Sequence, residues 1–281
     1  MTLFVLLIGL LLGLLTGSFL NVVVHRLPRM IEAAWEADQA AWQAERQGLP
    51  APAPGPRYDL AQPPSHCPSC HTRIRWYQLI PLLSWLWLRG RCAHCSQRIS
   101  VRYPLVELLT AGFGGWCAWR YGLTPAALLW FSFACLLLVI ALIDWDTTYL
   151  PDSLSLSLLA LGLLGSSLGW LDVPLQQTVW GALAGYGLLW LVSTLFHLVT
   201  GRIGMGNGDP MLYAALGAWF GLAGLIPILL LASLAGSMVG LYLKVKGQLR
   251  EGGYVPFGPF LALAGWSAWL MPLPVWLQWP L

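Results

Sequence analysis

Apolar residues dominate the chain in long blocks that contain few charged side chains. The first block runs from Thr2 to Val24, and seven more follow Pro104, at about residues 104–121, 124–143, 154–171, 178–199, 211–224, 227–243 and 257–278. Each block approaches the ~20 residues that an α-helix needs to cross bilayer hydrocarbon. The pattern therefore predicts an all-α polytopic membrane protein with about eight transmembrane helices.

One large polar region, about residues 26–102, separates the first two blocks. Its residues 31–47 are rich in Ala, with Trp35 and Trp42 seven apart, which favours a short amphipathic helix. The proline-rich stretch 49–64 is typical of a stiff linker. An apolar insert at residues 76–88 is too short to span a bilayer, so we expect it to lie against the membrane surface or to pack on the helices. No internal repeat is evident.

The composition agrees with this interpretation, because 57% of the residues are hydrophobic and only 10% are charged, against about 25% charged in a typical soluble domain. Ten arginines lie between Arg26 and Arg102, and the other basic residues are Arg120, Arg202, Lys244, Lys246 and Arg250. If the spans alternate, all of these except Arg120 fall on one side, which the positive-inside rule makes cytoplasmic. The sequence thus predicts a first transmembrane helix at 1–24, a cytoplasmic region at 25–103 and a seven-helix membrane domain at 104–281, with both termini outside.

Two aspartates lie next to predicted spans, Asp144 at the end of the third and Asp209 at the start of the sixth, on the same predicted face of the membrane. Ionisable groups at the edge of hydrocarbon are costly, so they mark a candidate functional site. Two carboxylates that share a proton can hydrolyse a peptide bond, one as a base toward water and the other as an acid toward the carbonyl. Gly206 and Gly208 would let a peptide approach Asp209 closely.

Other interpretations of these carboxylates stay open. Asp209 followed by Pro210 fits a helix N-cap with proline at the first helical position, and a helix N-terminus would bias Asp209 toward its ionised form. Asp144 could be a solvated loop residue, and Asp146 and Asp152 are its rivals as the partner of Asp209.

Four cysteines form two Cys-x-x-Cys pairs in the polar region, Cys67 with Cys70 and Cys92 with Cys95. The cytoplasm is reducing, so metal binding is favoured over disulfides. The spacing predicts a tetrahedral structural Zn²⁺ site, because the region is small and has little core of its own. Redox-sensitive or simply reduced thiols are the alternative. His71 and His94 could substitute as ligands, whereas Cys117 and Cys135 lie in apolar spans and are interpreted as packing residues.

Several motifs in the same order resemble the bacterial type IV prepilin peptidase family. They are Gly17-Ser-Phe-Leu-Asn-Val-Val-Val-His-Arg-Leu-Pro28, the two cysteine pairs, Arg102-Tyr-Pro-Leu-Val-Glu-Leu-Leu-Thr110, Ile143-Asp144, Leu150-Pro151-Asp152, Gly204-Met-Gly-Asn-Gly-Asp209 and Ala214-Ala-Leu-Gly-Ala-Trp219. The resemblance covers nearly the whole chain and places the catalytic aspartates at Asp144 and Asp209. Where the family has an aromatic residue before this glycine-aspartate pair and Phe-Lys after it, Asn207 and Pro210-Met211 stand here.

The resemblance implies a bacterial inner-membrane aspartic peptidase that removes the basic leader of type IV prepilins and pseudopilins after a Gly at the cytoplasmic face. It also implies N-methylation of the new N-terminus with S-adenosylmethionine. The residues themselves hardly indicate methyl transfer; Glu107 and Arg102 are candidates, and a Glu107–Arg pair that ties the second span to the cysteine region is the alternative. A peptidase without methyl transfer, and a transporter or assembly scaffold, are the competing functions. No nucleic-acid partner is expected.

Overall fold

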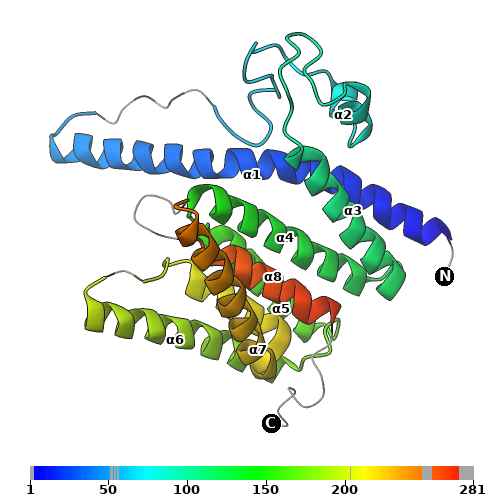
Figure 1. The fold of residues 1–281 in the computed structure, drawn as a ribbon. Coiled ribbons are helices and arrows are strands. Elements are labelled where there is room, and N and C mark those ends of the chain that lie inside the picture. The colour runs from blue at the N-terminus through cyan, green and yellow to red at the C-terminus, as the bar shows by residue number, and fades with distance from the viewer. Residues whose placement is uncertain are drawn as a thin grey trace. The chain divides into compact units, whose positions relative to one another are not determined.

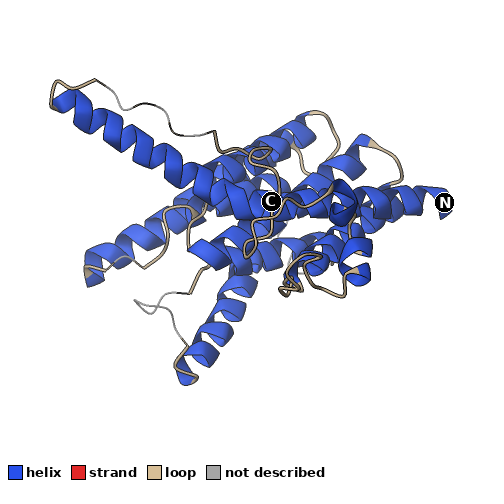
Figure 2. Ribbon diagram, turned by 90° about the horizontal axis from the view of Figure 1, so that it is seen from above, coloured by secondary structure: helices blue, strands red, loops and turns tan. Residues whose placement is uncertain are grey.

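The computed structural model describes residues 3–50, 53, 55, 57–202, 204–248 and 255–271. Among these residues there is no β-strand, and helices account for most of the chain (Figures 1 and 2). The elements are α1 (Leu3–Arg46), the 3₁₀ turn η1 (Trp76–Leu79), α2 (Leu83–Trp87), α3 (Arg102–Tyr121), α4 (Pro125–Thr147), α5 (Asp152–Ser167), α6 (Leu175–Thr200), α7 (Asp209–Val245) and α8 (Gly258–Leu270). The prediction of an all-α fold is confirmed.

The chain forms two compact units, Met1–Gly122 and Leu123–Leu281. In the first unit α3 packs along α1, and the cysteine region lies between these two helices in the sequence. The second unit contains α4 to α8. The boundaries predicted after residues 24 and 103 concern which segments cross the membrane, not how the helices pack. These boundaries stay a prediction.

Helix α1 joins the predicted first span and the predicted amphipathic helix into one helix of 44 residues that continues through Pro28 (Figure 1). At 1.5 Å per residue it is about 66 Å long, roughly twice the thickness of bilayer hydrocarbon. The apolar half, up to Val24, has the length of a span. The half that follows, up to Arg46, must therefore project beyond the hydrocarbon.

Small residues allow α1 and α3 to approach closely. A Cβ atom added to Gly9 would collide with the backbone of Gly114, and one added to Gly13 would lie 2.6 Å from the Cα of Ala111. A Cβ on Gly17 would lie 2.7 Å from the Cα of Glu107. This small-xxx-small stripe is typical of close helix pairs in membranes. Gly17 and Glu107 therefore lie at the same level of the pair.

A polar contact extends the α1–α3 pair toward the cysteine region. Asn21 Nδ2 donates to the backbone oxygen of Tyr103 over 3.2 Å, so Asn21 is an interhelical hydrogen-bond donor.

Cys117 is buried on α3, and Cys135 is buried on α4 in the other unit, as expected for packing residues.

Helix α7 consists of two arms that meet at Gly221, whose backbone is non-helical with φ +65°. The Tyr213 hydroxyl donates to the backbone oxygen of Leu225 over 2.6 Å, although an unbroken helix would place these residues about 18 Å apart along its axis. Phe260 at the start of α8 lies against Gly236 of the second arm, and Gly265 lies against Leu216 of the first arm. The chain therefore turns back at Gly221.

The two arms correspond to the predicted spans 211–224 and 227–243, but the predicted break at residues 225–226 was wrong. Pro227, the first residue of the later predicted span, lies inside the second arm. The positive φ at Gly221 suits a residue without a Cβ, and it sets the turn there instead.

By length and composition, α1, α4, α6 and α7 could each cross a membrane, and α5 is a shorter apolar helix. The protein is accordingly a membrane protein. The total of eight spans stays a prediction, because the two arms of α7 are counted above as a single helix. Residues 272–278 of the predicted last span, and Arg250, lie outside the described residues.

An aromatic cluster holds α4, α7 and α8 together. It comprises Trp130, Phe133, Trp219, Phe220 and Trp269, with ring centroids 4.6 Å apart for Phe133 and Trp219. Trp219 is 1% exposed, and its Nε1 donates to the backbone oxygen of Leu158 on α5 over 2.8 Å. The cluster fixes the relative heights of these helices.

Candidate active site and cysteine cluster

Asp144 lies in the last turn of α4 and Asp209 is the first residue of α7, and each is 3% exposed. From the Phe133–Trp219 contact, α4 runs 11 residues to Asp144 and the first arm of α7 runs 10 residues back to Asp209. Both paths are about 15 Å long. Because both paths start at one contact and the segments that carry the two aspartates meet again at Leu150, the two carboxylates lie at about the same height on the same side of the aromatic cluster.

Leu150 connects the segments that carry the two aspartates. A Cβ on Gly208 would lie 2.5 Å from the Cβ of Leu150, and a Cβ on Gly258 would lie 3.2 Å from Leu150 Cδ1 and 2.6 Å from Asp144 Oδ2. The start of α8 and the glycine loop before α7 thus approach the same buried leucine. Any side chain at Gly208 or Gly258 would push these segments apart.

Each carboxylate accepts a hydrogen bond from a glycine amide. Gly258 N donates to Asp144 Oδ2 over 2.9 Å, and Gly206 N donates to Asp209 Oδ2 over 3.1 Å. Asp209 Oδ1 is buried and has no hydrogen-bond partner among the described residues. This oxygen is therefore open to a hydrogen bond from water or from a substrate.

The N-cap interpretation of Asp209 was wrong. Gly208 is the N-cap of α7, Asp209 is the first helical residue, and its side chain turns back to the glycine loop. Asp209 still lies in the first turn, where the helix dipole favours a negative charge.

The rivals of Asp144 differ from it in exposure. Asp146 and Asp152 are both exposed, whereas Asp144 is buried beside Gly258. Sequence spacing could not distinguish the three, and Gly258 was missed altogether because it lies 114 residues from its partner Asp144.

The four predicted cysteine ligands come together in the first unit. The Sγ atoms of Cys67, Cys70, Cys92 and Cys95 all lie within 4.8 Å of one another, and none of these cysteines forms a disulfide. Four thiols at this spacing fit the donor set of a tetrahedral zinc site.

The two cysteine loops have the same backbone structure, shifted by 25 residues. Cys67 N donates to Thr72 O, as Cys92 N donates to Gln97 O, and Ile74 N donates to Ser65 O, as Ile99 N donates to Gly90 O. The residue after the second cysteine of each loop, His71 or Ser96, has a positive φ. A short internal repeat is therefore present, contrary to the sequence analysis. The shared Cys-x-x-Cys-x-x-Arg-Ile pattern could have revealed it.

Local hydrogen bonds favour the thiolate form of two cysteines in this cluster, whereas at Cys95 a backbone hydrogen bond with Gln97 is outweighed by burial and the other three thiols, which raise the pKa to about 11. Hydrogen bonds with the side chain and backbone of Thr72 lower the pKa of Cys70 to about 6, and those with the backbone of Cys95 and His94 lower the pKa of Cys92. The thiolate is the form that binds metal.

Comparisons with known proteins match a family model to each of the two units. Residues 11–121 match the Bacterial Peptidase A24 N-terminal domain, and residues 131–241 match the Type IV leader peptidase family. The chain is 49% identical over 258 residues to a prepilin leader peptidase/N-methyltransferase of Pseudomonas putida, with 92% of this chain and 87% of the relative covered. The chain belongs to the type IV leader peptidase family.

Two further relatives of this leader peptidase family bear the same name. The chain is 44% identical to one from Neisseria gonorrhoeae, with 94% of this chain and 90% of the relative covered. It is 46% identical to one from Pseudomonas aeruginosa, with 92% and 88% covered. No solved structure matches the chain significantly.

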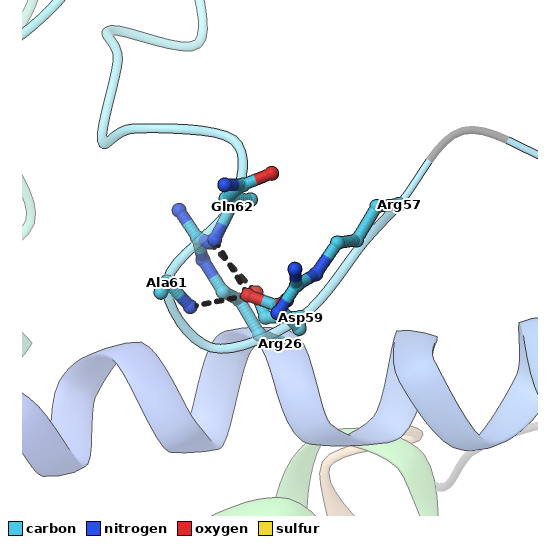
Figure 3. A network of polar contacts seen from close by, with 5 residues as sticks. All are labelled: Arg26, Arg57, Asp59, Ala61 and Gln62. Carbon is cyan, nitrogen blue, oxygen red and sulfur yellow. Dashed lines mark hydrogen bonds and ion pairs between the residues drawn. The ribbon is translucent and has the colours of Figure 1, made fainter.

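In this member of the leader peptidase family, Arg26 attaches the segment before the first cysteine loop to α1. Arg26 is 7% exposed and donates to the backbone oxygens of Asp59 and Pro63 over 2.9 and 2.6 Å. The Asp59 carboxylate accepts from the backbone amides of Gln62 and Ala61, which lower its pKa, and it pairs with Arg57 (Figure 3). The end of the predicted linker is therefore an ordered turn.

Glu107, a candidate for methyl transfer, is 7% exposed on α3. Its Oε2 accepts a hydrogen bond from the backbone amide of Leu82 over 2.8 Å. The carboxylate thus ties α3 to the apolar insert between the cysteine loops, through a backbone amide. Arg102 is the first residue of α3, five positions before Glu107.

Proposed function

We propose that this protein is an aspartic endopeptidase that removes the leader of type IV prepilins and pseudopilins after a Gly, with Asp144 and Asp209 as the catalytic pair. The observation that carries the proposal is the burial of both carboxylates at one height between α4, α7 and α8, in a chain that belongs to the leader peptidase family. The enzyme lies in the bacterial inner membrane with its site at the cytoplasmic face, where the basic residues gather.

The helix termini assign roles within the pair. Asp209 is at the start of α7, where the partial positive charge stabilises an anion, whereas Asp144 is at the end of α4, where the charge is of opposite sign. Asp209 is then the base, whose unpartnered Oδ1 takes a proton from water. Asp144 holds the shared proton and donates it to the oxygen of the scissile carbonyl.

The glycine contacts explain how a peptide reaches the pair. Gly206 and Gly208 form the active-site loop, and a Cβ on Gly206 would lie 3.3 Å from Asp209 Oδ2. The missing side chain of Gly206 leaves room for substrate backbone beside the carboxylate, whereas that of Gly208 lets the loop pack closely against Leu150. With Asn207 and Pro210 in place of the usual family residues around this loop, the Gly206–Asp209 hydrogen bond is formed.

We also propose that the enzyme N-methylates the new N-terminal residue with S-adenosylmethionine as the donor. This part rests on the relatives' names. The contacts of Glu107 with Leu82 favour a structural role for that carboxylate over a catalytic one. Glu107 and Arg102 are the candidates that mutation can test for methyl transfer.

The proposal is tested by the intact mass of a prepilin after incubation with the purified enzyme and S-adenosylmethionine. Loss of the leader together with a gain of one methyl group is expected for the wild type, and neither is expected for Asp209→Asn, because uncleaved substrate offers no new N-terminus. Cleavage without the added methyl group would support a peptidase alone. An uncut precursor with the wild type, when a control leader peptidase cuts the same preparation, would favour a transporter or scaffold.

The cysteine cluster is proposed to hold one structural Zn²⁺ through Cys67, Cys70, Cys92 and Cys95. The expected result is about one zinc per purified chain, because four thiolates saturate a tetrahedral ion. Cys70→Ser is expected to lose the metal and to lower the thermal stability, since the cysteine loops have little other support. Metal content by mass spectrometry and thermal unfolding measure both effects.

Cys117→Ala is the matched control for zinc binding, because Cys117 is buried on α3 outside the cluster. It should retain the metal. A zinc content that is unchanged in Cys70→Ser would contradict the tetrathiolate site.

A further inference from the structure

The apolar insert, residues 76–88, exposes large side chains in a region that otherwise consists of polar loops. Trp76 is 79% exposed, Trp87 76%, Leu83 66% and Leu86 63%. No residue of η1 or α2 is buried. A contiguous apolar surface of this kind marks a contact with another apolar phase or partner.

Hydrogen bonds show how deep the insert lies along the membrane-crossing part of α1. Ser18 Oγ donates to the backbone oxygen of Leu79 over 3.4 Å, and Leu82 N donates to Glu107 Oε2. Glu107 is at the level of Gly17. Ser18 and Gly17 lie six and seven residues before Val24, the last apolar residue of the span, which corresponds to about 10 Å.

At that depth an open loop must have its backbone groups satisfied by protein. Leu82, the N-cap of α2, has φ +59°, and no side-chain cap forms there. The buried Glu107 carboxylate accepts from its amide instead. A carboxyl oxygen buried on α3 thus supports a short, non-helical piece of backbone within the apolar zone.

The charges around the insert are of one sign. Residues 60–106 contain no Asp or Glu and six arginines. Five of these are exposed: Arg73, Arg75, Arg89, Arg91 and Arg98. Arg75 and Arg89 stand immediately outside the two ends of the insert. Even beside the negative charge of a zinc tetrathiolate, such a cluster attracts anionic headgroups at the membrane surface.

We infer that residues 76–88 form a re-entrant segment immersed in the leaflet next to the cysteine region, with Trp76, Leu83, Leu86 and Trp87 among the acyl chains and the flanking arginines on anionic headgroups. The segment anchors the cysteine loops to the membrane from both sides, because each loop adjoins one end of it. Glu107 is the positioning residue that holds it at depth.

The test uses the full chain in nanodiscs of phosphatidylcholine with a minor share of phosphatidylglycerol. The photoreactive residue p-benzoylphenylalanine replaces Trp87, and in a matched control it replaces Trp42. Trp42 is also exposed, at 56%, but lies on the part of α1 that projects beyond the hydrocarbon. After irradiation, mass spectrometry is expected to find lipid adducts at position 87 and at least tenfold fewer at position 42. Leader cleavage by both variants shows that they are folded.

Two further comparisons separate the acyl from the headgroup contact. The share of phosphatidylglycerol among the adducts should exceed its share in the disc, and Arg75→Gln with Arg89→Gln should bring it down to that share. Glu107→Leu should reduce the adduct yield severalfold, whereas Glu107→Gln, which keeps an acceptor oxygen, should not. Adducts at position 87 to the prepilin or to a second copy of the chain, or equal lipid adducts at positions 87 and 42, would overturn the inference.

Discussion

The rate of leader removal is expected to fall by about 10³-fold or more when Asp144 is replaced by Asn, since general acid catalysis alone contributes 10²–10⁴-fold. The amide cannot hold the shared proton, yet its oxygen can still accept from Gly258 N, so the fold should be retained. Single-turnover cleavage of a prepilin measures the rate. Thermal unfolding in detergent checks that the variant is folded.

Asp146→Asn and Asp152→Asn are the matched controls, because both carboxylates are exposed and lie within eight residues of Asp144. Their cleavage rates should stay within a fewfold of the wild type. If Asp152→Asn abolished cleavage and Asp144→Asn did not, the catalytic pair proposed above would be wrong.

Replacing Gly13 by Ala is expected to destabilise the first unit by about 1–3 kcal/mol or more, because overpacking a close contact forces backbone shifts. The new Cβ would collide with the backbone oxygen of Thr110 and lie 2.6 Å from Ala111 Cα, and neither group can rotate away. Helices α1 and α3 would have to separate. A lower thermal unfolding midpoint in detergent is the measurement.

Gly112→Ala provides the comparison, since Gly112 lies on α3 and nothing comes within 4 Å of a Cβ added there. This substitution should be neutral or slightly stabilising, because alanine has the higher helix propensity. Equal loss of stability in both variants would mean that the contact between α1 and α3 is not as close as described.

The sequence located the candidate carboxylates and the cysteine ligands because each depends on short-range pattern. Asp144 and Asp209 stand at the ends of apolar blocks, and the four cysteines occur in two pairs of fixed spacing. Gly258 could not be found in this way, because its hydrogen bond to Asp144 depends on how α8 packs on α4. The contacts of Leu150 could not be predicted either, because in the sequence it is one apolar residue among many.

Helix boundaries were harder to predict where one local signal opposed another. The first apolar block ends at Val24 and a separate helix was predicted at residues 31–47, but α1 continues through Pro28 to Arg46. A new span was predicted from residue 227, but the positive φ of Gly221 sets the turn. The glycines at 9, 13 and 17 could have been recognised as a helix-packing stripe, and they were interpreted only as part of an apolar span.

The unequal arms of α7 set a requirement on the substrate. The second arm passes the level of the aspartates near Gly236, next to Phe260 of α8, and continues to Val245, so it extends about 14 Å past them. A scissile bond at the aspartates therefore lies about 14 Å from the level at which the arm ends. An extended chain covers about 3.3 Å per residue, so about four unfolded residues must separate the cut site from any bulky folded part of the precursor on that side.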